Sequence, residues 1–247
     1  MNSVCVATYN GEKYIEEQLR SILTQIAADD EVIVSDDGST DGTCAIVESL
    51  TDPRIKLLHH NGHNFKQNFI YALQHTQGEY IFLSDQDDVW MPEKYRICCE
   101  QLQNFDLVIT DSVVTDENLQ TIQSSFFNFY KSGPGLIKNS VRNTYFGACM
   151  AFRRRILNAA MPFPTTNEIG HDIWIGLVAE IIGKVQFLHQ PLLLYRRHAS
   201  ALTKLDGSLM TRSKRPLCVK IWSRMIVLLD VMRFFIRYKF GKIGKKI

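Results

Sequence analysis

Residues 80–88 read YIFLSDQDD, a short apolar run that ends in three carboxylates within four positions. The apolar part predicts a buried strand over residues 80–84. The carboxylates of Asp85, Asp87 and Asp88 repel one another unless a cation lies among them. Oxygen ligands of this kind suit Mg²⁺ or Mn²⁺, which bridge protein carboxylates and substrate phosphates. By itself, this stretch predicts a divalent-metal site and a solvated acidic loop about equally well.

The residues before this stretch alternate between strand-like and helix-like patterns. Short apolar runs occupy residues 4–7, 31–35 and 54–58, and helical spacing of apolar residues occupies 15–26, 46–50 and 65–73. This alternation predicts an α/β fold with a mostly parallel, Rossmann-like central sheet and helices on both faces. Ligands bind such sheets at the carboxyl ends of the strands, where Thr8, Asp36, Asp37 and the 85–88 cluster would converge.

The rest of the chain is less regular. Strand-like segments cover residues 107–110, 145–152, 185–188 and 192–195, and a helix is predicted over 171–182. There is no internal repeat or glycine-serine linker. We therefore expect one domain over residues 1–205 and a basic amphipathic segment over 206–247.

A second polar cluster, SDDGSTDG, spans residues 35–42. Ionised aspartates only accept hydrogen bonds, so they could bind the imide N–H of a base or the hydroxyls of a ribose. The alternative is a turn that caps the next helix through Ser39 or Asp41. The chain has no glycine-rich phosphate loop, so a diphosphate would be held by a metal and basic side chains.

Three separated motifs carry a family resemblance: ATYNG at residues 7–11, DDGSTD at 36–41 and LSDQDDVW at 83–90. Together they resemble the signatures of family 2 glycosyltransferases with the GT-A fold. The DQDD-x-W form is similar to that of bacterial rhamnosyltransferase-like members, which build O-antigen and capsule. The resemblance covers roughly residues 1–205.

The resemblance implies roles for individual residues. Asp37 would contact the base or ribose, Asp85 the ribose, and Asp87 the metal. Lys66 could face the nucleotide, although a solvated helix start explains it equally well. The expected nucleotide-binding residues are Thr8, Asn10, Asp36, Asp37, Lys66, Asp85 and Arg196.

Two further motifs resemble family segments. GHDIW at residues 170–174 would supply Asp172 as the general base, with His171, Trp174 and Gly147 on the acceptor side. The alternative is that Asp172 has a structural role and stabilises the N-terminus of the helix by capping it and by its negative charge. YRRH at residues 195–198 would supply Arg196 to the diphosphate and His198 to the metal, whereas a surface basic run is the alternative.

Charge is distributed unevenly along the chain. Residues 212–247 carry eleven Lys and Arg against one acidic residue, a net +10, which leaves −8 on the rest of a chain of net +2. Apolar residues between Trp222 and Ile236 recur at helical spacing, but no apolar run approaches the roughly 20 residues of a spanning helix. We expect a cytoplasmic protein that binds the anionic inner face of the cell membrane peripherally. Packing of this stripe on protein is the alternative.

The six cysteines show no metal-binding or redox spacing, and the N-terminus does not read as a signal peptide, which suits a reducing cytoplasm. The expected function is inverting transfer of a sugar from dTDP-rhamnose or a UDP-sugar to a hydroxyl of a lipid-linked saccharide, with Mn²⁺ or Mg²⁺ as cofactor. No nucleic-acid partner is expected. The alternatives are a non-catalytic sugar- or nucleotide-binding protein and a nucleotidyltransferase, although the latter usually carries a glycine-rich N-terminal loop that residues 7–11 do not provide.

Overall fold

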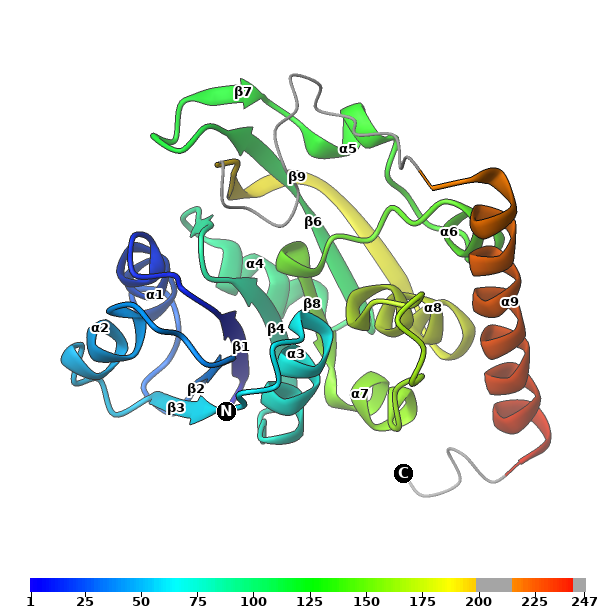
Figure 1. Cartoon of the computed structure of the whole chain (residues 1–247), viewed down its shortest axis with the longest axis horizontal. Coiled ribbons are helices and arrows are strands. Elements are labelled where there is room, and N and C mark those ends of the chain that lie inside the picture. The colour runs from blue at the N-terminus through cyan, green and yellow to red at the C-terminus, as the bar shows by residue number, and fades with distance from the viewer. Residues whose placement is uncertain (199–214, 242–247) are drawn as a thin grey trace.

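The structure, a computed structural model, describes residues 1–198 and 215–241 (Figure 1). Its first part alternates β1 (Ser3–Thr8), α1 (Ile15–Leu23), β2 (Glu31–Asp36), α2 (Thr43–Ser49), β3 (Ile55–His59), α3 (Phe65–Gln74) and β4 (Tyr80–Asp85). β1 pairs in parallel with both β2 and β4, and β2 pairs in parallel with β3. The predicted alternation is therefore confirmed, and the carboxyl ends of β1, β2 and β4 lie at one edge.

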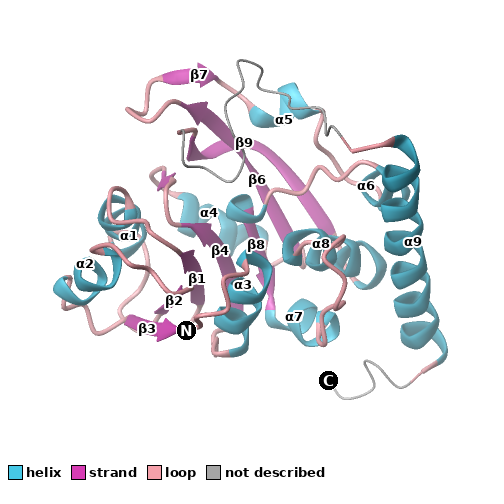
Figure 2. Cartoon of the chain, in the orientation of Figure 1, coloured by secondary structure: helices cyan, strands magenta, loops and turns pink. Residues whose placement is uncertain are grey.

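The second part adds β5 (Val89–Trp90), α4 (Lys94–Gln101), β6 (Leu107–Thr115), β7 (Thr121–Gln123), α5 (Phe126–Tyr130), α6 (Leu136–Val141), the 3₁₀ turn η1 (Gly147–Cys149), β8 (Met150–Arg153), α7 (Arg154–Ala160), α8 (His171–Ile182), β9 (Val185–Arg196) and α9 (Leu217–Phe240). The described strands form one sheet in the order β3-β2-β1-β4-β8-β6-β9-β5, with β7 beside β6 (Figure 2). β8 is antiparallel to β4 and β6, so the sheet becomes mixed beyond β4.

Two strand predictions differ from the structure. Residues 145–152 were expected as one strand, but η1 occupies Gly147–Cys149 and the strand starts only at Met150. Residues 185–188 and 192–195 were expected as two strands, but β9 runs through both. Pro191, which has no N–H to donate, faces Asp111 where the register of β6 shifts, so the pairing continues past the proline.

Helices cover both faces of the sheet. Ser84 and Phe82, two residues apart on β4, share one face; Ser84 bonds to Gln18 of α1, and Phe82 stacks on Tyr95 of α4. α3 packs on β1 and β2 from the viewer's side in Figure 1, with α4 behind the sheet. The strands β1 and β2 are buried along their whole length, as a doubly covered sheet requires.

α9 stands along the outer edge of the molecule beside α6 and α8 (Figure 1). Its contact face consists of Ser223, Val227, Val231 and Phe234, which recur at helical spacing and are buried. Phe234 meets Trp174 of α8 edge to face, with ring centroids 5.6 Å apart. The domain boundary predicted between residues 205 and 206 lies outside the described residues.

Candidate active site

The loop after β1 is joined to the loop after β4 through one side chain. Gln86 Oε1 accepts hydrogen bonds from Thr8 Oγ1 at 2.6 Å and from the Tyr9 N–H at 2.8 Å, and Gln86 Nε2 donates to the Tyr9 carbonyl. A Cβ on Gly11 would lie 2.3 Å from Gln86 Oε1, so this contact requires glycine there. Thr8 is thus a bridging residue at the predicted edge.

The two aspartates after β2 are used differently. Both carboxylate oxygens of Asp36 accept hydrogen bonds from within their own turn, from the N–H groups of Gly38 and Ser39 and from Ser39 Oγ. Asp37 Oδ1 accepts hydrogen bonds from the N–H groups of Gly62 and His63, each at 2.8 Å, while its Oδ2 accepts none from the described residues. Asp36 therefore shapes the turn, and Asp37 keeps one oxygen for a ligand.

Asn10 lies across the same opening. Its backbone adopts a left-handed conformation, with φ of 48°, and its Oδ1 accepts the N–H of Thr40 at 2.8 Å. Its backbone N–H donates to Ser39 Oγ. The loops after β1 and β2 are therefore bonded together around the predicted nucleotide edge.

Asp87 and His198, 111 positions apart, come together in the structure. Asp87 Oδ2 lies 2.8 Å from His198 Nε2, and the imidazole packs at 4.8 Å on the ring of Tyr14. The His198 side chain is 6% exposed and that of Asp87 18% exposed. His198 Nδ1 is buried and has no hydrogen-bond partner among the described residues.

Arg196, predicted to bind the diphosphate, contacts protein groups in the structure. Its guanidinium donates to the carbonyls of Asp87 and Glu117 at 2.8 Å each, forms an ion pair with Glu17, and lies 4.6 Å from the Tyr14 ring centroid. Its backbone N–H donates to Asp88 Oδ1 at 3.0 Å. Through these contacts Arg196 braces the 85–88 loop.

Beneath that loop lies a buried cation that the sequence did not single out. Lys94 is 1% exposed, donates to the Ala148 carbonyl at 2.7 Å and lies 4.8 Å from the Trp90 ring centroid. Burial lowers the pKa of Lys94, and the negative charges of Asp88 and Asp85 act in the opposite sense. Lys94 thus links the carboxylate loop to η1.

Asp85 is electrostatically coupled to residues from two other segments. Burial, followed by the negative charges of Asp87 and Asp172, raises the pKa of Asp85 to about 8. The 3₁₀ turn η1 packs against both β4 and α8, and Gly147 of η1 lies beside Asp172, so the start of α8 is near the end of β4. The predicted base and the predicted metal ligand therefore share one site.

Gly147, His171 and Asp172 also converge. A Cβ added to Gly147 would lie 3.6 Å from His171 Nε2 and 3.8 Å from Asp172 Oδ2. Asp172 Oδ1 accepts the Ile173 N–H, whereas Oδ2 accepts no hydrogen bond from the described residues. The free oxygen of Asp172 is thus available as a proton acceptor beside Gly147.

His171 is an unusual neighbour for that base. It is 3% exposed, stacks on Phe69 with ring centroids 4.1 Å apart, and neither ring nitrogen has a hydrogen-bond partner among the described residues. Burial lowers the pKa of His171 to about 4, so the imidazole is neutral at pH 7. It does not contribute a positive charge to the site.

Two predicted site residues lie elsewhere. Lys66 was expected at the nucleotide, but its Nζ donates to the carbonyls of Pro164 and Thr166, at 2.5 and 2.7 Å. Trp174 was expected on the acceptor side, but its indole is buried and donates to the Ala160 carbonyl at 2.8 Å. Both side chains hold the segment between α7 and α8.

The arrangement of Asp87 and His198 fits a divalent cation. A carboxylate and a neutral imidazole are ligands that Mn²⁺ accepts, and the partly exposed Asp87 leaves a side open to a phosphate oxygen. A second group of ligand atoms, from Asp36, Cys44 and His59, lies within 4.8 Å of one another. Because both oxygens of Asp36 are already bonded in the turn, the Asp87–His198 pair fits the cation better.

Sequence reasoning missed several residues of this site. Glu17 and Tyr14 hold Arg196 and His198, yet neither belongs to a motif, and their partners lie some 180 positions away, so no local pattern reveals them. Gln86 and Lys94 carry a weak signal, since the first lies within the acidic cluster and the second follows it closely.

Comparison with known proteins identifies the family of the chain. The model of glycosyl transferase family 2 matches residues 3–160, more than half of the chain. The dTDP-rhamnosyl transferase RfbG of Shigella flexneri is 29% identical over 230 residues, which cover 85% of this chain and 77% of RfbG. The UDP-Glc:alpha-D-GlcNAc-diphosphoundecaprenol beta-1,3-glucosyltransferase WfgD of Escherichia coli is 30% identical over 183 residues, 72% of this chain and 70% of WfgD.

The fold also has solved counterparts. The crystal structure of S. aureus TarS 1-349 in complex with UDP-GlcNAc superimposes with a TM-score of 0.68 at 19% identity, covering 99% of this chain and 74% of the other. The chain spans 65% and 62% of the length of two further curated glycosyltransferase relatives. On the extent of the family match, the chain belongs to glycosyl transferase family 2.

Proposed function

We propose that this chain is an inverting, metal-dependent glycosyltransferase, with a donor side formed by Asn10, Asp37, Asp85, Asp87 and His198 and an acceptor side formed by Gly147, His171 and Asp172. The observation that carries the proposal is the convergence of these segments. Asp87 and His198 approach within 2.8 Å, and Asp172 lies beside Gly147 of η1, which packs on β4. A metal-binding pair and a free carboxylate oxygen beside it are the two parts that single displacement requires.

On the donor side, Asp37 Oδ2 and the side-chain amide of Asn10 bind the base or ribose, and Asp85 binds a ribose hydroxyl. Asp87 and His198 would hold the cation, which would supply positive charge against the departing nucleoside diphosphate. Arg196, Gln86 and Lys94 keep this loop in place. The donor is dTDP-rhamnose or a UDP-sugar, in keeping with the names of RfbG and WfgD.

On the acceptor side, Asp172 Oδ2 takes the proton of an acceptor hydroxyl as that oxygen forms its bond to the anomeric carbon. The bond from that carbon to the diphosphate oxygen breaks on the opposite face. The anomeric configuration is therefore inverted through an oxocarbenium-like transition state. The acceptor is a lipid-linked saccharide of bacterial surface polysaccharide synthesis, which the name of WfgD supports.

We further propose that α9 attaches the protein to the anionic inner face of the cell membrane. The predicted stripe comprises Trp222, Met225, Ile226, Leu229, Met232, Phe235 and Ile236, and all of these except the half-buried Ile226 are exposed. Trp222, Met225, Leu229, Met232 and Ile236 lie opposite the buried contact face of α9, since each residue turns the helix by about 100°. Lys and Arg side chains flank the stripe, with Asp230 as the single acidic residue of α9. Among the described residues, no helix is both long and apolar enough to cross a membrane.

Donor turnover tests the proposal most directly. The full chain is incubated with Mn²⁺ and a panel of dTDP- and UDP-sugars, and release of the nucleoside diphosphate is read by mass spectrometry. We expect one donor to be turned over, with loss of turnover in EDTA. NMR of the glycosylated product then gives the anomeric configuration, and retention would exclude single displacement.

A further inference from the structure

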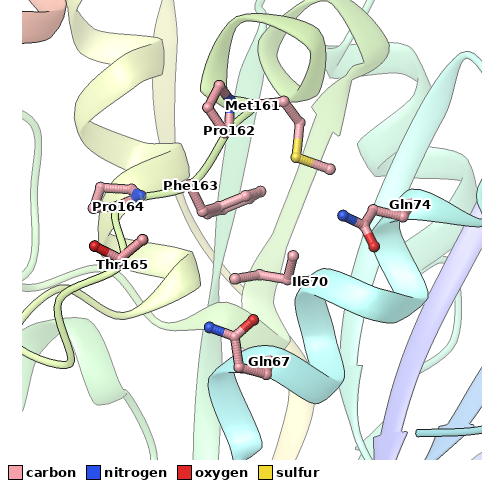
Figure 3. A pocket seen from close by; sticks show the side chains of 8 residues that line it. All are labelled: Gln67, Ile70, Gln74, Met161, Pro162, Phe163, Pro164 and Thr165. Atoms are coloured by element: carbon pink, nitrogen blue, oxygen red, sulfur yellow. The ribbon is translucent and has the colours of Figure 1, made fainter.

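An open pocket lies on the flank of α3, apart from the carboxylates. It has a volume of about 460 Å³, and α3 and the loop after α7 line it (Figure 3). The α3 wall consists of Gln67, Ile70 and Gln74, and the loop wall consists of residues 161–165. None of the proposed donor-side residues lines the pocket, so it is separate from the nucleotide site.

The chemistry of the lining is uncharged and mixed. Phe163 directs its ring toward Ile70 of α3, and Met161, Pro162 and Pro164 complete the apolar part (Figure 3). The side chains of Gln67, Gln74 and Thr165 have no hydrogen-bond partner among the described residues. A charged ligand would find no counter-charge here, and a lipid tail would leave two amides unpaired.

The loop wall is held before any ligand arrives. Lys66 donates to the carbonyls of Pro164 and Thr166, and Trp174 donates to the Ala160 carbonyl just before the loop. A wall that is already ordered lowers the entropic cost of binding. Lys66 and Trp174, which were predicted at the catalytic site, therefore hold the loop wall of this pocket.

The pocket is close to the acceptor side. Phe69 of α3 stacks on His171, while the next residue, Ile70, faces the pocket. The distance across α3 is about 10 Å, the diameter of a helix with its side chains. The loop that forms the wall also leads directly into His171 and Asp172.

We propose that this pocket binds a neutral saccharide unit of the acceptor, one or more sugars away from the hydroxyl that reacts. A sugar ring offers an apolar C–H face to Phe163 and hydroxyls to the amides of Gln67 and Gln74. The volume lies within the roughly 300–1,000 Å³ of ligand pockets, which leaves room for a short saccharide. This inference rests on the proposed function for the direction of the acceptor, but the binding itself needs no catalysis.

Methyl NMR of the full chain tests the proposal. Met161 and Ile70 report on the pocket, and Met150, fully buried in β8, is the internal control. The probes are chitotriose, maltotriose and a rhamnose trisaccharide, each compared with its monosaccharide, and 1-octanol. We expect at least one trisaccharide to shift the Met161 and Ile70 signals at concentrations where its monosaccharide does not.

Variants then assign the contact. Gln67 and Gln74 are exposed, so the double substitution Gln67→Ala and Gln74→Ala leaves the core intact, and Gln77→Ala removes an exposed glutamine outside the pocket. We expect the double variant to bind the trisaccharide about tenfold more weakly, since two hydrogen bonds are lost, and Gln77→Ala to bind normally. Unchanged binding by the double variant overturns the proposal, as does a shift by 1-octanol alone or by no probe.

The same titration in Asp172→Asn separates this inference from the proposed function. A shift at Met161 in an active or an inactive variant shows saccharide binding regardless of the role of Asp172. If the chain transfers sugar normally but no saccharide shifts the Met161 and Ile70 signals, the pocket does not bind the acceptor. The proposed catalytic function would be unaffected by that result.

Discussion

On the proposed donor side, hydrogen bonds join the loops that carry the polar side chains, although Asp37 Oδ2 and His198 Nδ1 have no partner among the described residues. On the proposed acceptor side, no hydrogen bond joins the side chain of His171 or Asp172 to another segment of the described chain. Gln86 accepts hydrogen bonds from Thr8 and Tyr9, and Asp37 accepts hydrogen bonds from the loop at residues 60–63. The guanidinium of Arg196 donates to two backbone carbonyls. Across the site, both nitrogens of His171 and one oxygen of Asp172 accept or donate nothing.

This difference has a physical consequence. Hydrogen bonds between these loops fix the geometry of the donor side in advance. A nucleotide that binds there would therefore lose little free energy to reorganisation of the protein. Unpaired buried polar atoms cost stability, by about 1–3 kcal/mol each, and are tolerated where a ligand or the reaction uses them. Under the proposed function, a preformed donor side would recognise the nucleotide, and the unbonded atoms of the acceptor side would be open to the acceptor.

The largest expected effect comes from the free oxygen of Asp172. Asp172→Asn keeps the shape and the bond to Ile173 but removes the proton acceptor, so transfer should fall by about 10²- to 10⁴-fold. Nucleotide affinity with Mn²⁺, measured by calorimetry, should stay close to that of the unmodified chain, because the donor side is intact. Near-normal transfer would exclude Asp172 as the base, and Glu168 or His171 would be examined next.

A smaller loss is expected from the metal pair. His198→Gln removes the imidazole beside Asp87, and we expect Mn²⁺ affinity to fall by at least the roughly 10- to 100-fold that is lost when a group orienting a metal ligand is removed. Asp87→Ala should weaken nucleotide binding in the presence of Mn²⁺, as seen by calorimetry. His59→Gln is the matched control, because His59 belongs to the other cluster of ligand atoms. A greater loss in His59→Gln than in His198→Gln would move the cation to that cluster.

Because burial lowers the pKa of His171, we expect the free energy of unfolding to depend on pH. The folded chain keeps this imidazole neutral down to about pH 4, whereas the unfolded chain protonates it near pH 6.5. Between these values the unfolded state binds more protons, so stability falls as the pH falls through this window and levels off below it. The contribution approaches about 3 kcal/mol by pH 4.

Denaturant unfolding at several pH values measures this contribution. His171→Phe retains the stack on Phe69 but cannot titrate, so its stability should decline less between pH 7 and pH 4. Parallel stability curves for the two proteins would contradict the buried, neutral state of His171.

The sequence predicted the parallel part of the sheet, up to residue 90, better than the mixed part that follows it. The alternation of apolar runs and helical patterns up to residue 90 is local, so the parallel strands and the edge where Thr8, Asp37 and Asp85 lie followed from it. The pairing of Asp87 with His198 was suggested by motif resemblance, although 111 positions separate them.

Three predicted site residues have contacts in the structure that no local sequence pattern records. Arg196 and Lys66 were assigned to the nucleotide because a cation suits a diphosphate, yet backbone carbonyls from distant loops bind both. Trp174 was assigned to the acceptor side, but the carbonyl of Ala160 and the ring of Phe234 place it in the core. Side chains with long-range partners could be placed only from the folded structure.

The smallest expected effects are on membrane binding by α9. This helix carries the proposed membrane surface and belongs to neither the donor side nor the acceptor side. Trp222 is 62% exposed and Met232 52% exposed, while Val227 and Val231 hold the helix on the domain. Each Lys or Arg near an anionic surface adds about 1 kcal/mol, so Arg233→Gln and Arg237→Gln should each weaken binding about fivefold. The control Arg20→Gln removes an exposed arginine of α1.

Sedimentation of the full chain with vesicles that contain phosphatidylglycerol, at low and high salt, measures these differences. Binding should fall as salt rises, because the charged part of the attraction is screened. Trp222→Ala should lower binding at both salt concentrations, because it removes apolar area rather than charge. If the full chain stays in the supernatant at low salt, the exposed stripe of α9 does not bind membrane. If Trp222→Ala instead changes the oligomeric state seen by light scattering, the stripe joins two copies of the chain, since its opposite face is already occupied by the domain.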